Sequence, residues 1–403
     1  MAAEVGMSAR AGLRSQQVLT RCFACQRWGG IIQPMKLFTS FSILGVLLPL
    51  LIITAIVVFY AQGWRLDLTK GAVEKTGIVL IRSVPEGAKV RLNDELITAT
   101  DSPIPDLKPG TYRLKVEKEG YFPWEKDVPV EEGFVTDITA LLPPLSPSLT
   151  AVTQKGARLV TKAPSGSKAI FVSGKELYLL NLSNPALGFL RTTPQKIAEE
   201  STNFPLAEAT ALRWSPNEDQ ILVSVERQHY LVSATGRNGS PTPVTAITDL
   251  LDNWDITATE QKTTLITRLA SDEEQAAEAI KPTALWSPDE QKFLYVKEVD
   301  GKRQFWVTDL SDPLPIGDSA HQLVTETENA QLQLFWLADS HHFVMIDNGT
   351  VSLLDLDGSN KRTLFRGTLA EDVALSTMDL SKIIILTSIA PETPANLYAI
   401  SLR

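Results

Sequence analysis

The chain has 403 residues and carries 47 acidic against 38 basic side chains, a formal net charge of −9 at pH 7. This acidic balance argues against binding nucleic acid or an anionic membrane surface through bulk charge. The two cysteines, Cys22 and Cys25, lie near the N-terminus, so no disulfide can cross-link the remainder, which fits a bacterial envelope better than an animal extracellular space. The Cys-x-x-Cys pair has neither a second pair nor a nearby histidine, so we expect no metal.

The first predicted element is an apolar run over residues 37–61 that contains no charged side chain. At about 1.5 Å per residue, a helix of this length can cross a hydrocarbon core of roughly 30 Å. The run is longer than a secretory signal core, and Phe59 and Tyr60 stand where a signal peptidase needs small residues. We therefore predict a single uncleaved transmembrane helix, with a cleaved signal peptide as the alternative.

The flanking charges predict the orientation of this helix. Residues 1–36 contain five basic side chains against the single acid Glu4. By the positive-inside rule this tail is cytoplasmic, residues 62–76 form a juxtamembrane segment, and the rest lies outside the cell membrane. Met35 is a second candidate start, and in that case the orientation rests on Lys36 and the terminal amine alone.

Residues 77–143 have the pattern of a small antiparallel β-sandwich. Residues 77–84 are apolar and β-branched, and the segments that follow alternate between apolar and polar side chains. Tyr112, Leu114 and Val116 share one face of their predicted strand. Asn93-Asp94 interrupts an alternating stretch and predicts a hairpin turn.

A short motif within this region is typical of a known family. Pro85-Glu86-Gly87-Ala88 follows the first predicted strand, where Pro85 ends the strand and Gly87 permits a positive φ. Further matching segments are Ser102-Pro103-Ile104, Leu107-Lys108-Pro109-Gly110-Thr111-Tyr112 and Gly120-Tyr121. Together they resemble the PEGA domain family, which usually has a glycine where Asn93-Asp94 stands. The resemblance implies contact with surface-layer or cell-wall material.

Three aromatic residues, Tyr121, Phe122 and Trp124, lie close together near the end of this region. We favour packing at the core and edge of the sandwich, and a surface platform for carbohydrate is the alternative. Residues 141–149 contain three prolines, so residues 144–149 are predicted to form a stiff linker.

Residues 150–403 contain an internal repeat in which a tryptophan precedes a polar turn and an apolar strand. The clear copies begin at Trp214-Ser215-Pro216, Trp286-Ser287-Pro288-Asp289 and Trp336. The tryptophan is expected to end a strand and pack between blades, and proline and aspartate to shape the turn. The second strands, near residues 178, 230, 306, 352 and 398, are separated by 52, 76, 46 and 46 residues. A period near 46 matches one four-stranded blade, and the repeat resembles the TolB-like or WD40-like β-propellers.

The 76-residue interval departs from this period. It contains a strand-like run, Thr263-Thr264-Leu265-Ile266-Thr267, and an acidic, alanine-rich segment over residues 271–280 that predicts a short helix or loop. We favour six blades, one of them divergent, over a five-bladed ring with an insertion. Residues 149–159 are expected to supply an outer strand that closes the ring with the last blade.

The sequence offers few candidates for chemistry. No Gly-x-Ser-x-Gly elbow or phosphate-binding glycine loop occurs. His341 and His342 are adjacent, so on a strand they point to opposite faces and cannot share a metal. Asp355-Leu356-Asp357-Gly358 resembles part of a calcium loop but lacks the third acid and the distal glutamate, so a hairpin turn is favoured. We expect no catalytic, cofactor-binding or metal-binding residues.

These patterns together predict an all-β ectodomain on one membrane anchor in a bacterial cell envelope. We expect a non-enzymatic binding or scaffold role in which the propeller is an interaction platform for protein or glycan. The expected partners are the membrane and an envelope protein or wall polymer, not nucleic acid. The alternative is a hydrolase or lyase with its site in the central funnel, which converging carboxylates or histidines around a deep pocket would favour.

Overall fold

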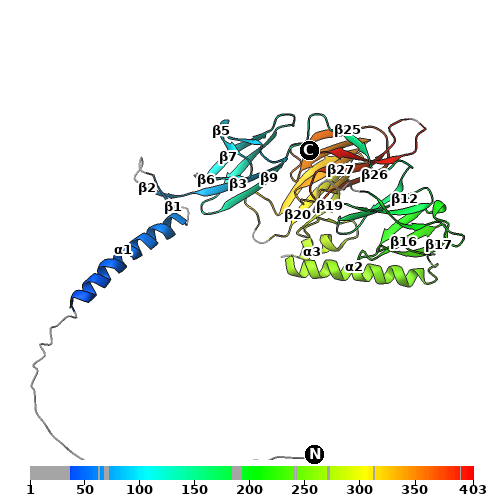
Figure 1. Ribbon diagram of the computed structural model, residues 1–403, viewed down its shortest axis with the longest axis horizontal. Helices are drawn as coiled ribbons and strands as arrows, with labels where there is room; N and C mark the ends of the chain where they lie inside the picture. The colour runs from blue at the N-terminus through cyan, green and yellow to red at the C-terminus, as the bar shows by residue number, and fades with distance from the viewer. Residues whose placement is uncertain are drawn as a thin grey trace, which may run out of the picture. The chain divides into compact units, whose positions relative to one another are not determined.

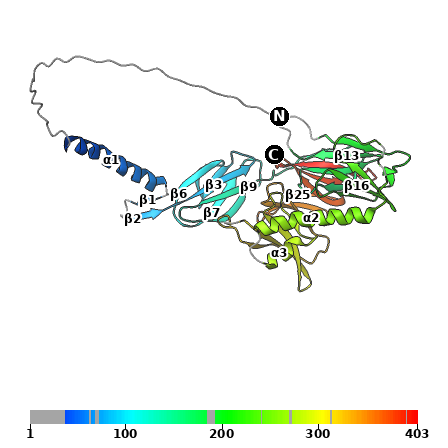
Figure 2. The same cartoon turned by 90° about the horizontal axis from the view of Figure 1, so that it is seen from below.

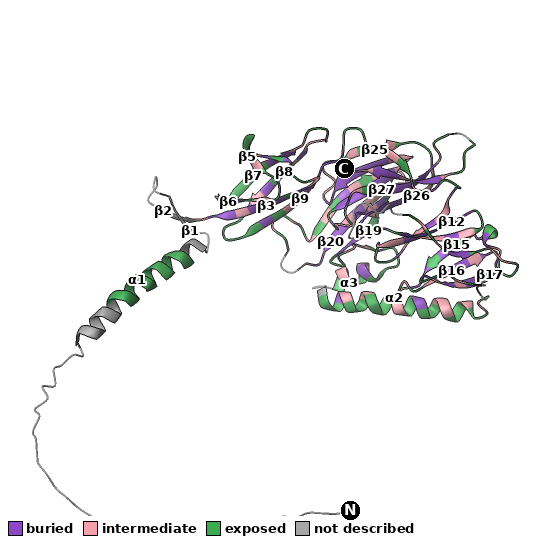
Figure 3. Ribbon diagram, viewed as in Figure 1, coloured by how far each residue is buried: buried purple, intermediate pink, exposed green. Residues whose placement is uncertain are grey.

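The computed structural model describes residues 37–61, 64–67, 72–183, 193–239, 241, 243–269, 273–311, 314–390 and 392–403. The predicted cytoplasmic tail, with Cys22 and Cys25, lies outside these residues. The chain divides into two compact units, residues 1–58 and 59–403. The first contains most of helix α1 (Leu37–Ala61), whose described side chains, at residues 45–58, are all exposed (Figure 3).

The predicted membrane span is not confirmed. Residues 37–61 are helical, as expected, with Pro49 inside the helix. However, none of the helices in the described part of the chain combines the length and apolarity needed to cross a bilayer.

Two packed sheets form the first β domain. Strands β3 (Gly77–Val84), β6 (Ser102–Leu107) and β9 (Val135–Leu141) make one sheet; β4 (Lys89–Leu92), β5 (Glu95–Ala99), β7 (Gly110–Glu117) and β8 (Trp124–Val130) make the other. Every second residue of β3 is buried, as period-2 alternation requires, and Ile81 packs against Leu114 and Val116 of β7 in the shared core. The short strands β1 (Trp64–Asp67) and β2 (Ala72–Lys75) pair within the predicted juxtamembrane segment.

The expected sandwich is present, but it is not wholly antiparallel. β3 pairs β6 antiparallel and β9 parallel. The strand before β9 in the sequence, β8, belongs to the opposite sheet. The chain therefore crosses between the sheets before β9, and β9 runs in the same direction as its neighbour β3. Local alternation predicts strands but does not encode this pairing.

Backbone conformation in the motif region follows the expectation from residue type. Gly87 has φ +72°, and Asn93 and Asp94 have φ 48° and 68° in the two-residue turn between β4 and β5. Ala88 N donates to Thr100 Oγ1 (2.9 Å), which in turn lies 2.7 Å from Ser83 Oγ. Residues 85–88 are therefore held by a buried hydroxyl pair.

Five sheets of the β-propeller type follow in the described residues, and we number them as blades in chain order (Figure 1). Blade one consists of β11 (Arg158–Lys162), β12 (Lys168–Ser173), β13 (Glu176–Asn181) and β14 (Gln195–Glu199). Blade two consists of β15 (Ala211–Trp214), β16 (Gln220–Val225) and β17 (Gln228–Ser233), and blade three of β18 (Leu285–Trp286), β19 (Lys292–Val299), β20 (Lys302–Asp309) and β21 (His321–Thr327). Blade four consists of β22 (Gln333–Trp336), β23 (His342–Asp347), β24 (Thr350–Asp355) and β25 (Arg362–Arg366), and blade five of β26 (Leu369–Ser376), β27 (Lys382–Thr387), β28 (Asn396–Ser401) and β10 (Leu149–Ala151).

The chain begins and ends its propeller in the same blade. β10 pairs antiparallel with β28, so the segment just after the proline-rich linker supplies the outer strand of blade five. The expected closing strand is confirmed. It joins the two ends of the repeat through backbone hydrogen bonds rather than through side chains alone.

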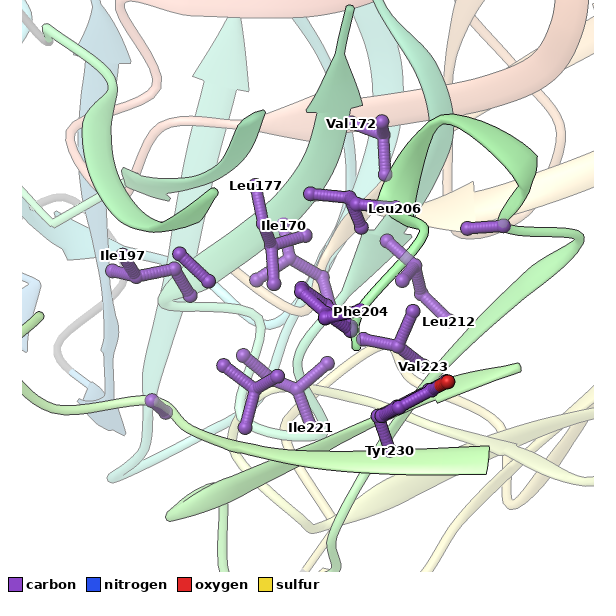
Figure 4. Packing of buried hydrophobic residues seen from close by; sticks show 14 of the residues in the cluster. Ile170, Val172, Leu177, Ile197, Phe204, Leu206, Leu212, Ile221, Val223 and Tyr230 are labelled. Carbon is purple, nitrogen blue, oxygen red and sulfur yellow. The ribbon is translucent and has the colours of Figure 1, made fainter. Parts of the chain in front are cut away.

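Apolar clusters join successive blades. Between blades one and two, the cluster contains Ile170, Phe204, Ile221 and Tyr230 (Figure 4). Comparable clusters join blade three to four, four to five, and five to one. The central strands of the blades therefore carry most of the buried side chains.

Helices, not a sixth blade, occupy the long interval between blades two and three. α2 (Ile247–Leu269) and α3 (Glu273–Ile280) lie side by side there (Figures 1 and 2). In the described residues the propeller therefore has five sheets, and the expectation of six blades is wrong. The helices contact both neighbours: Arg213 of blade two pairs with Asp255 at 2.5 Å, and Ala279 belongs to the apolar cluster of blade three.

The predicted strand at residues 263–267 is also wrong, because this run is part of α2. Its threonines satisfy their hydroxyls within the helix: Thr264 Oγ1 donates to Glu260 O (2.9 Å) and Thr267 Oγ1 to Thr263 O (2.8 Å). The β-branched side chains suggested a strand, but the surrounding helical context overrides that weak local preference.

Candidate functional site

The repeat turns place polar side chains at one end of each blade. In blade three, Ser287 Oγ accepts a hydrogen bond from Lys292 N (3.0 Å), and Asp289 Oδ1 accepts one from Gln291 N (3.1 Å). In blade four the aspartate makes the same contact, since Asp339 Oδ1 accepts from His341 N (3.1 Å), while Leu337 stands where blade three has Ser287. Oδ1 of Asp289 and of Asp339 thus stabilises the tight turn, and Oδ2 of each is left to contact other side chains.

The signature tryptophans join neighbouring elements of the ring. Trp214 Nε1 donates to Thr161 O of blade one (3.1 Å), and Trp336 Nε1 donates to Leu285 O of blade three (2.8 Å). Trp286 Nε1 instead donates to Ala279 O of α3 (3.1 Å), because the helix stands where a preceding inner strand would be. Ser215 and Ser287 are buried, and Pro216 and Pro288 are half-buried in the turns that follow.

Blades three and four bury one basic side chain each. Lys292 is 2% exposed, and its Nζ lies 3.4 Å from Asp289 Oδ2 and 3.5 Å from Asp309 Oδ2. His342 is also 2% exposed, with Nδ1 2.6 Å from Asp339 Oδ2. Buried charges require such partners, because an unpaired charge in a protein interior is costly.

The carboxylates around His342 control its protonation. Burial alone would lower the pKa of His342, but Asp339 and then Asp355 outweigh it, and the pKa is raised. Burial likewise opposes ionisation of Asp339, yet the charge and hydrogen bond of His342 bring the pKa of this carboxyl down to about 2. His341 is exposed, so the two histidines do point apart, as expected.

The first β domain docks on this end of blade four. Trp124 Nε1 donates to Asp355 Oδ2 (2.8 Å), and Asn360 pairs with the backbone of Glu125 through both ends of its amide (3.1 Å each). Lys126 Nζ lies 2.7 Å from Asp357 Oδ2. The loop over residues 355–360 is therefore the surface on which the sandwich rests.

The three aromatic residues do not form a surface platform. Trp124 is only 2% exposed, Tyr121 packs against the sandwich core, and Phe122 lies under the Arg362 guanidinium, 5.6 Å from the ring centre. The favoured interpretation, packing at core and edge, is consistent with these contacts. What sequence reasoning missed is that the edge in question is an interface with the propeller.

A cavity of about 330 Å³ lies at this junction, lined by both domains. Four of the side chains that line it are ion-paired with carboxylates: Arg82 with Asp137, Lys126 with Asp357, Lys292 with Asp289 and Asp309, and His342 with Asp339 and Asp355. The fifth, His341, is exposed, and its Nδ1 lies 2.6 Å from the backbone oxygen of Asp339. Asp318 differs, because burial first and Asp309 second raise the pKa of its carboxyl. The cavity thus holds several ion pairs, the exposed carboxylate of Asp127 and one acid, Asp318, that is costly to ionise.

The described residues contain no cluster of three or more His, Cys, Asp or Glu side chains that could hold a metal ion. Residues 355–358 form the expected hairpin turn, in which Gly358 N donates to Asp355 O (2.9 Å). Asp309, Asp318 and Lys292 carried no sequence signal, because they come together only when β19 pairs with β20 inside blade three and places Lys292 opposite Asp309.

Comparison with known proteins agrees with part of this description. Residues 76–146 match the PEGA domain family. No curated protein matches the chain by sequence. The fold and the junction thus define a chain with a PEGA domain docked on a five-sheet propeller.

Solved structures with similar folds include TolB proteins. A putative TolB from Agrobacterium tumefaciens has a TM-score of 0.24 at 12% identity, covering 63% of this chain and 89% of that one. TolB from Acinetobacter baumannii has 0.23 at 15% identity, covering 72% and 60%. The β-propeller domain of Myceliophteria thermophila Cps50 (Swd1) has 0.29 at 11% identity, covering 64% and 100%.

Proposed function

We propose that this chain is a membrane-anchored binding or scaffold protein of a bacterial cell envelope. In this proposal residues 37–61 are the anchor, residues 1–36 are cytoplasmic, and the PEGA domain and propeller are displayed outside. The uncharged apolar run, its basic flank and the absence of cysteine from residues 62–403 support this arrangement. The proposed partners are an envelope protein or a cell-wall or surface-layer polymer, and not nucleic acid.

The observation that carries the proposal is the docking of the PEGA domain through Trp124, Glu125 and Lys126. These contacts join the PEGA domain directly to the propeller. The outer surfaces of the two domains are therefore held in a fixed orientation relative to each other. A protein that works by holding partners in place benefits from such preorganisation, because less freedom is lost when a partner binds.

The junction cavity also favours a second candidate, an enzyme. Asp318 has a raised pKa and lines the same cavity as His341, which is the kind of environment in which hydrolases place an acid. The ion pairs around it weigh against this reading, since Arg82, Lys126, Lys292 and His342 are already paired with carboxylates and His341 is the lining residue outside these pairs. We therefore prefer the binding role.

A binding assay separates these roles. The full-length protein in detergent should co-sediment with purified peptidoglycan, or capture a defined protein from envelope extracts, without releasing soluble wall fragments. Release of fragments that is abolished in Asp318→Asn would establish the enzyme instead. Retention by neither material would refute the binding proposal.

Cysteine labelling tests the proposed topology. Glu298→Cys, an exposed position on β19, should react with a membrane-impermeant maleimide on intact cells. Ser352→Cys is the matched control, because Ser352 is fully buried and should react only after unfolding. Labelling of Glu298→Cys that requires cell lysis would overturn the orientation.

A further inference from the structure

A second cavity, of about 290 Å³, lies between α3 and blade three, away from the PEGA junction. Its lining includes Glu274 and Glu278 from the helix and Tyr295, Lys297, Trp306 and His321 from the sheet. This volume is close to the lower end of small-molecule sites, about 300 Å³. The cavity is therefore large enough for one small ring but not for an extended ligand.

The cavity exists because a short helix replaces a blade here. At other junctions an inner strand covers the neighbouring sheet, but beside blade three the Trp286 indole bonds to α3 instead. The face of blade three beside α3 carries a cross-strand aromatic pair, since Tyr295 of β19 stands opposite Trp306 of β20. Period-2 alternation places Lys297 and Thr308 on the same face as this pair.

Internal hydrogen bonds hold the surrounding side chains in position. Trp306 Nε1 donates to Gln304 Oε1 (3.1 Å), and Gln304 Nε2 donates to Glu326 Oε2 (2.6 Å). On the opposite side, His321 Nδ1 lies 3.0 Å from Thr308 Oγ1. These hydrogen bonds hold the Trp306 indole ring in position before a ligand binds, and a ligand stacked on the ring would leave them intact.

Other polar groups are available to a ligand. Within the described part of the chain, no hydrogen bond uses the Tyr295 hydroxyl or the Glu274 carboxylate. Glu278 uses Oε1 for Lys281 Nζ (2.7 Å), and its second oxygen forms no described hydrogen bond. The cavity therefore combines aromatic faces with hydrogen-bond acceptors and one hydroxyl.

The charges exclude two classes of ligand. An anion would meet the carboxylates of Glu274 and Glu278. A cation would be repelled by Lys297, which lines the same cavity with its Nζ 5.3 Å from the centre of the Tyr295 ring. A neutral sugar fits, because its C–H face packs on the electron-rich face of an aromatic ring while its hydroxyls bond to carboxylates and Tyr295.

We infer that the cavity between α3 and blade three binds a single ring of a neutral saccharide, with Trp306 as the stacking residue. The inference rests on the proposed binding role and assigns its glycan-binding element to the propeller rather than to the PEGA domain. Glu274 and Tyr295 then select for hydroxyl groups, and the exposed mouth of the cavity admits a terminal sugar of a longer chain.

The test is calorimetric titration of the full-length protein in detergent with N-acetylglucosamine, its tetramer and a glucose tetramer. We expect saturable binding of at least one probe and a loss of about tenfold or more in affinity for Trp306→Ala. Tyr295→Phe and Glu274→Gln, which preserve packing, should weaken binding by a smaller factor. Phe134→Ala, at an exposed aromatic residue of the PEGA domain, is the control and should bind as the unaltered protein does.

The outcomes separate this inference from the proposed function. Affinity unchanged in both Trp306→Ala and Tyr295→Phe, or no binding of any probe by a protein that still co-sediments with peptidoglycan, overturns the saccharide site alone. Failure to retain peptidoglycan or any envelope protein refutes the binding proposal. Tighter binding of the tetramer than of the monomer would identify a glycan chain, not a free sugar, as the source of the ring.

Discussion

Asp355 has partners on both sides of the junction between the PEGA domain and the propeller. Its Oδ2 accepts from Trp124 Nε1 (2.8 Å) and Asn360 Nδ2 (2.9 Å), and its Oδ1 lies 3.4 Å from His342 Nε2. A buried carboxylate is tolerated only when such bonds replace water. One side chain thus connects the docking of a domain to the packing of blade four.

Asp318 gives a prediction at the scale of one residue. The pKa of Asp318 is higher in the folded protein than in the unfolded chain, so the carboxyl binds its proton more tightly when the protein is folded. This proton stabilises the fold at low pH, and the stabilisation is lost as the pH rises through the folded-state pKa. Asp318→Asn should therefore be more stable than the unaltered protein at pH 7. The difference should shrink as pH falls and vanish below about 3.9, the usual pKa of an unfolded aspartate.

Denaturant unfolding between pH 4 and pH 8 measures this difference. Asp127→Asn is the matched control, because Asp127 is exposed at the same cavity and its charge should matter little. A destabilised Asp318→Asn at pH 7 would contradict the assignment of Asp318 as a group that is costly to ionise.

At the scale of elements, the loop that follows β24 determines where the PEGA domain rests. Gly358 has φ +77°, and a Cβ atom there would lie only 2.1 Å from Val324 O of β21. The loop therefore needs glycine for two reasons, its backbone conformation and its close approach to blade three. The sequence Asp-Gly predicted a turn here, but it could not predict the approach.

Gly358→Ala should destabilise the protein by about 2–4 kcal/mol, because backbone strain adds to a steric clash that moves the loop. Gly174→Ala is the matched control: it has φ +57° with no atom within 4 Å of the added Cβ, so it should lose about 1 kcal/mol from strain alone. Thermal and denaturant unfolding measure the loss of stability in each variant. If Gly358→Ala loses no more stability than Gly174→Ala, the result would argue against the clash with blade three.

At the scale of the whole molecule, the PEGA domain and the propeller should unfold together. Apolar contacts reinforce the polar ones, since Leu141 of β9 belongs to the same buried cluster as Leu337 and Ile383 of the propeller. Trp124→Phe keeps an aromatic ring at this position but removes part of the indole and the N–H that donates to Asp355. We expect a loss of about 1–3 kcal/mol and a separate, earlier transition of the PEGA domain.

Calorimetry and limited proteolysis at the proline-rich segment measure this coupling. Faster cleavage within residues 144–149 should accompany the earlier transition in Trp124→Phe, while Phe134→Ala should unfold as the unaltered protein does. A single unshifted transition in Trp124→Phe would show that the indole bond does not hold the domains together.

Sequence reasoning succeeded where a pattern acts over a few residues. Alternation located the strands of the sandwich, Asn93-Asp94 and Gly87 marked positions of positive φ, and the repeat of Trp214, Trp286 and Trp336 located three blades. It failed at residues 263–267, where β-branched composition suggested a strand and the chain forms a helix. Local preference is weak, and helix neighbours on both sides outweigh it.

The amino-acid sequence by itself determined that this chain has a PEGA-like β-sandwich followed by repeated β-sheets, because turn chemistry and alternation depend only on near neighbours. Tertiary structure decided the rest: five sheets with a helical insertion, the parallel pairing of β3 with β9, and the junction that buries Trp124 against Asp355. Those two residues are 231 positions apart, and no local pattern relates residues at that separation. Their contact arises from packing two separately built domains, so only the folded chain reveals it.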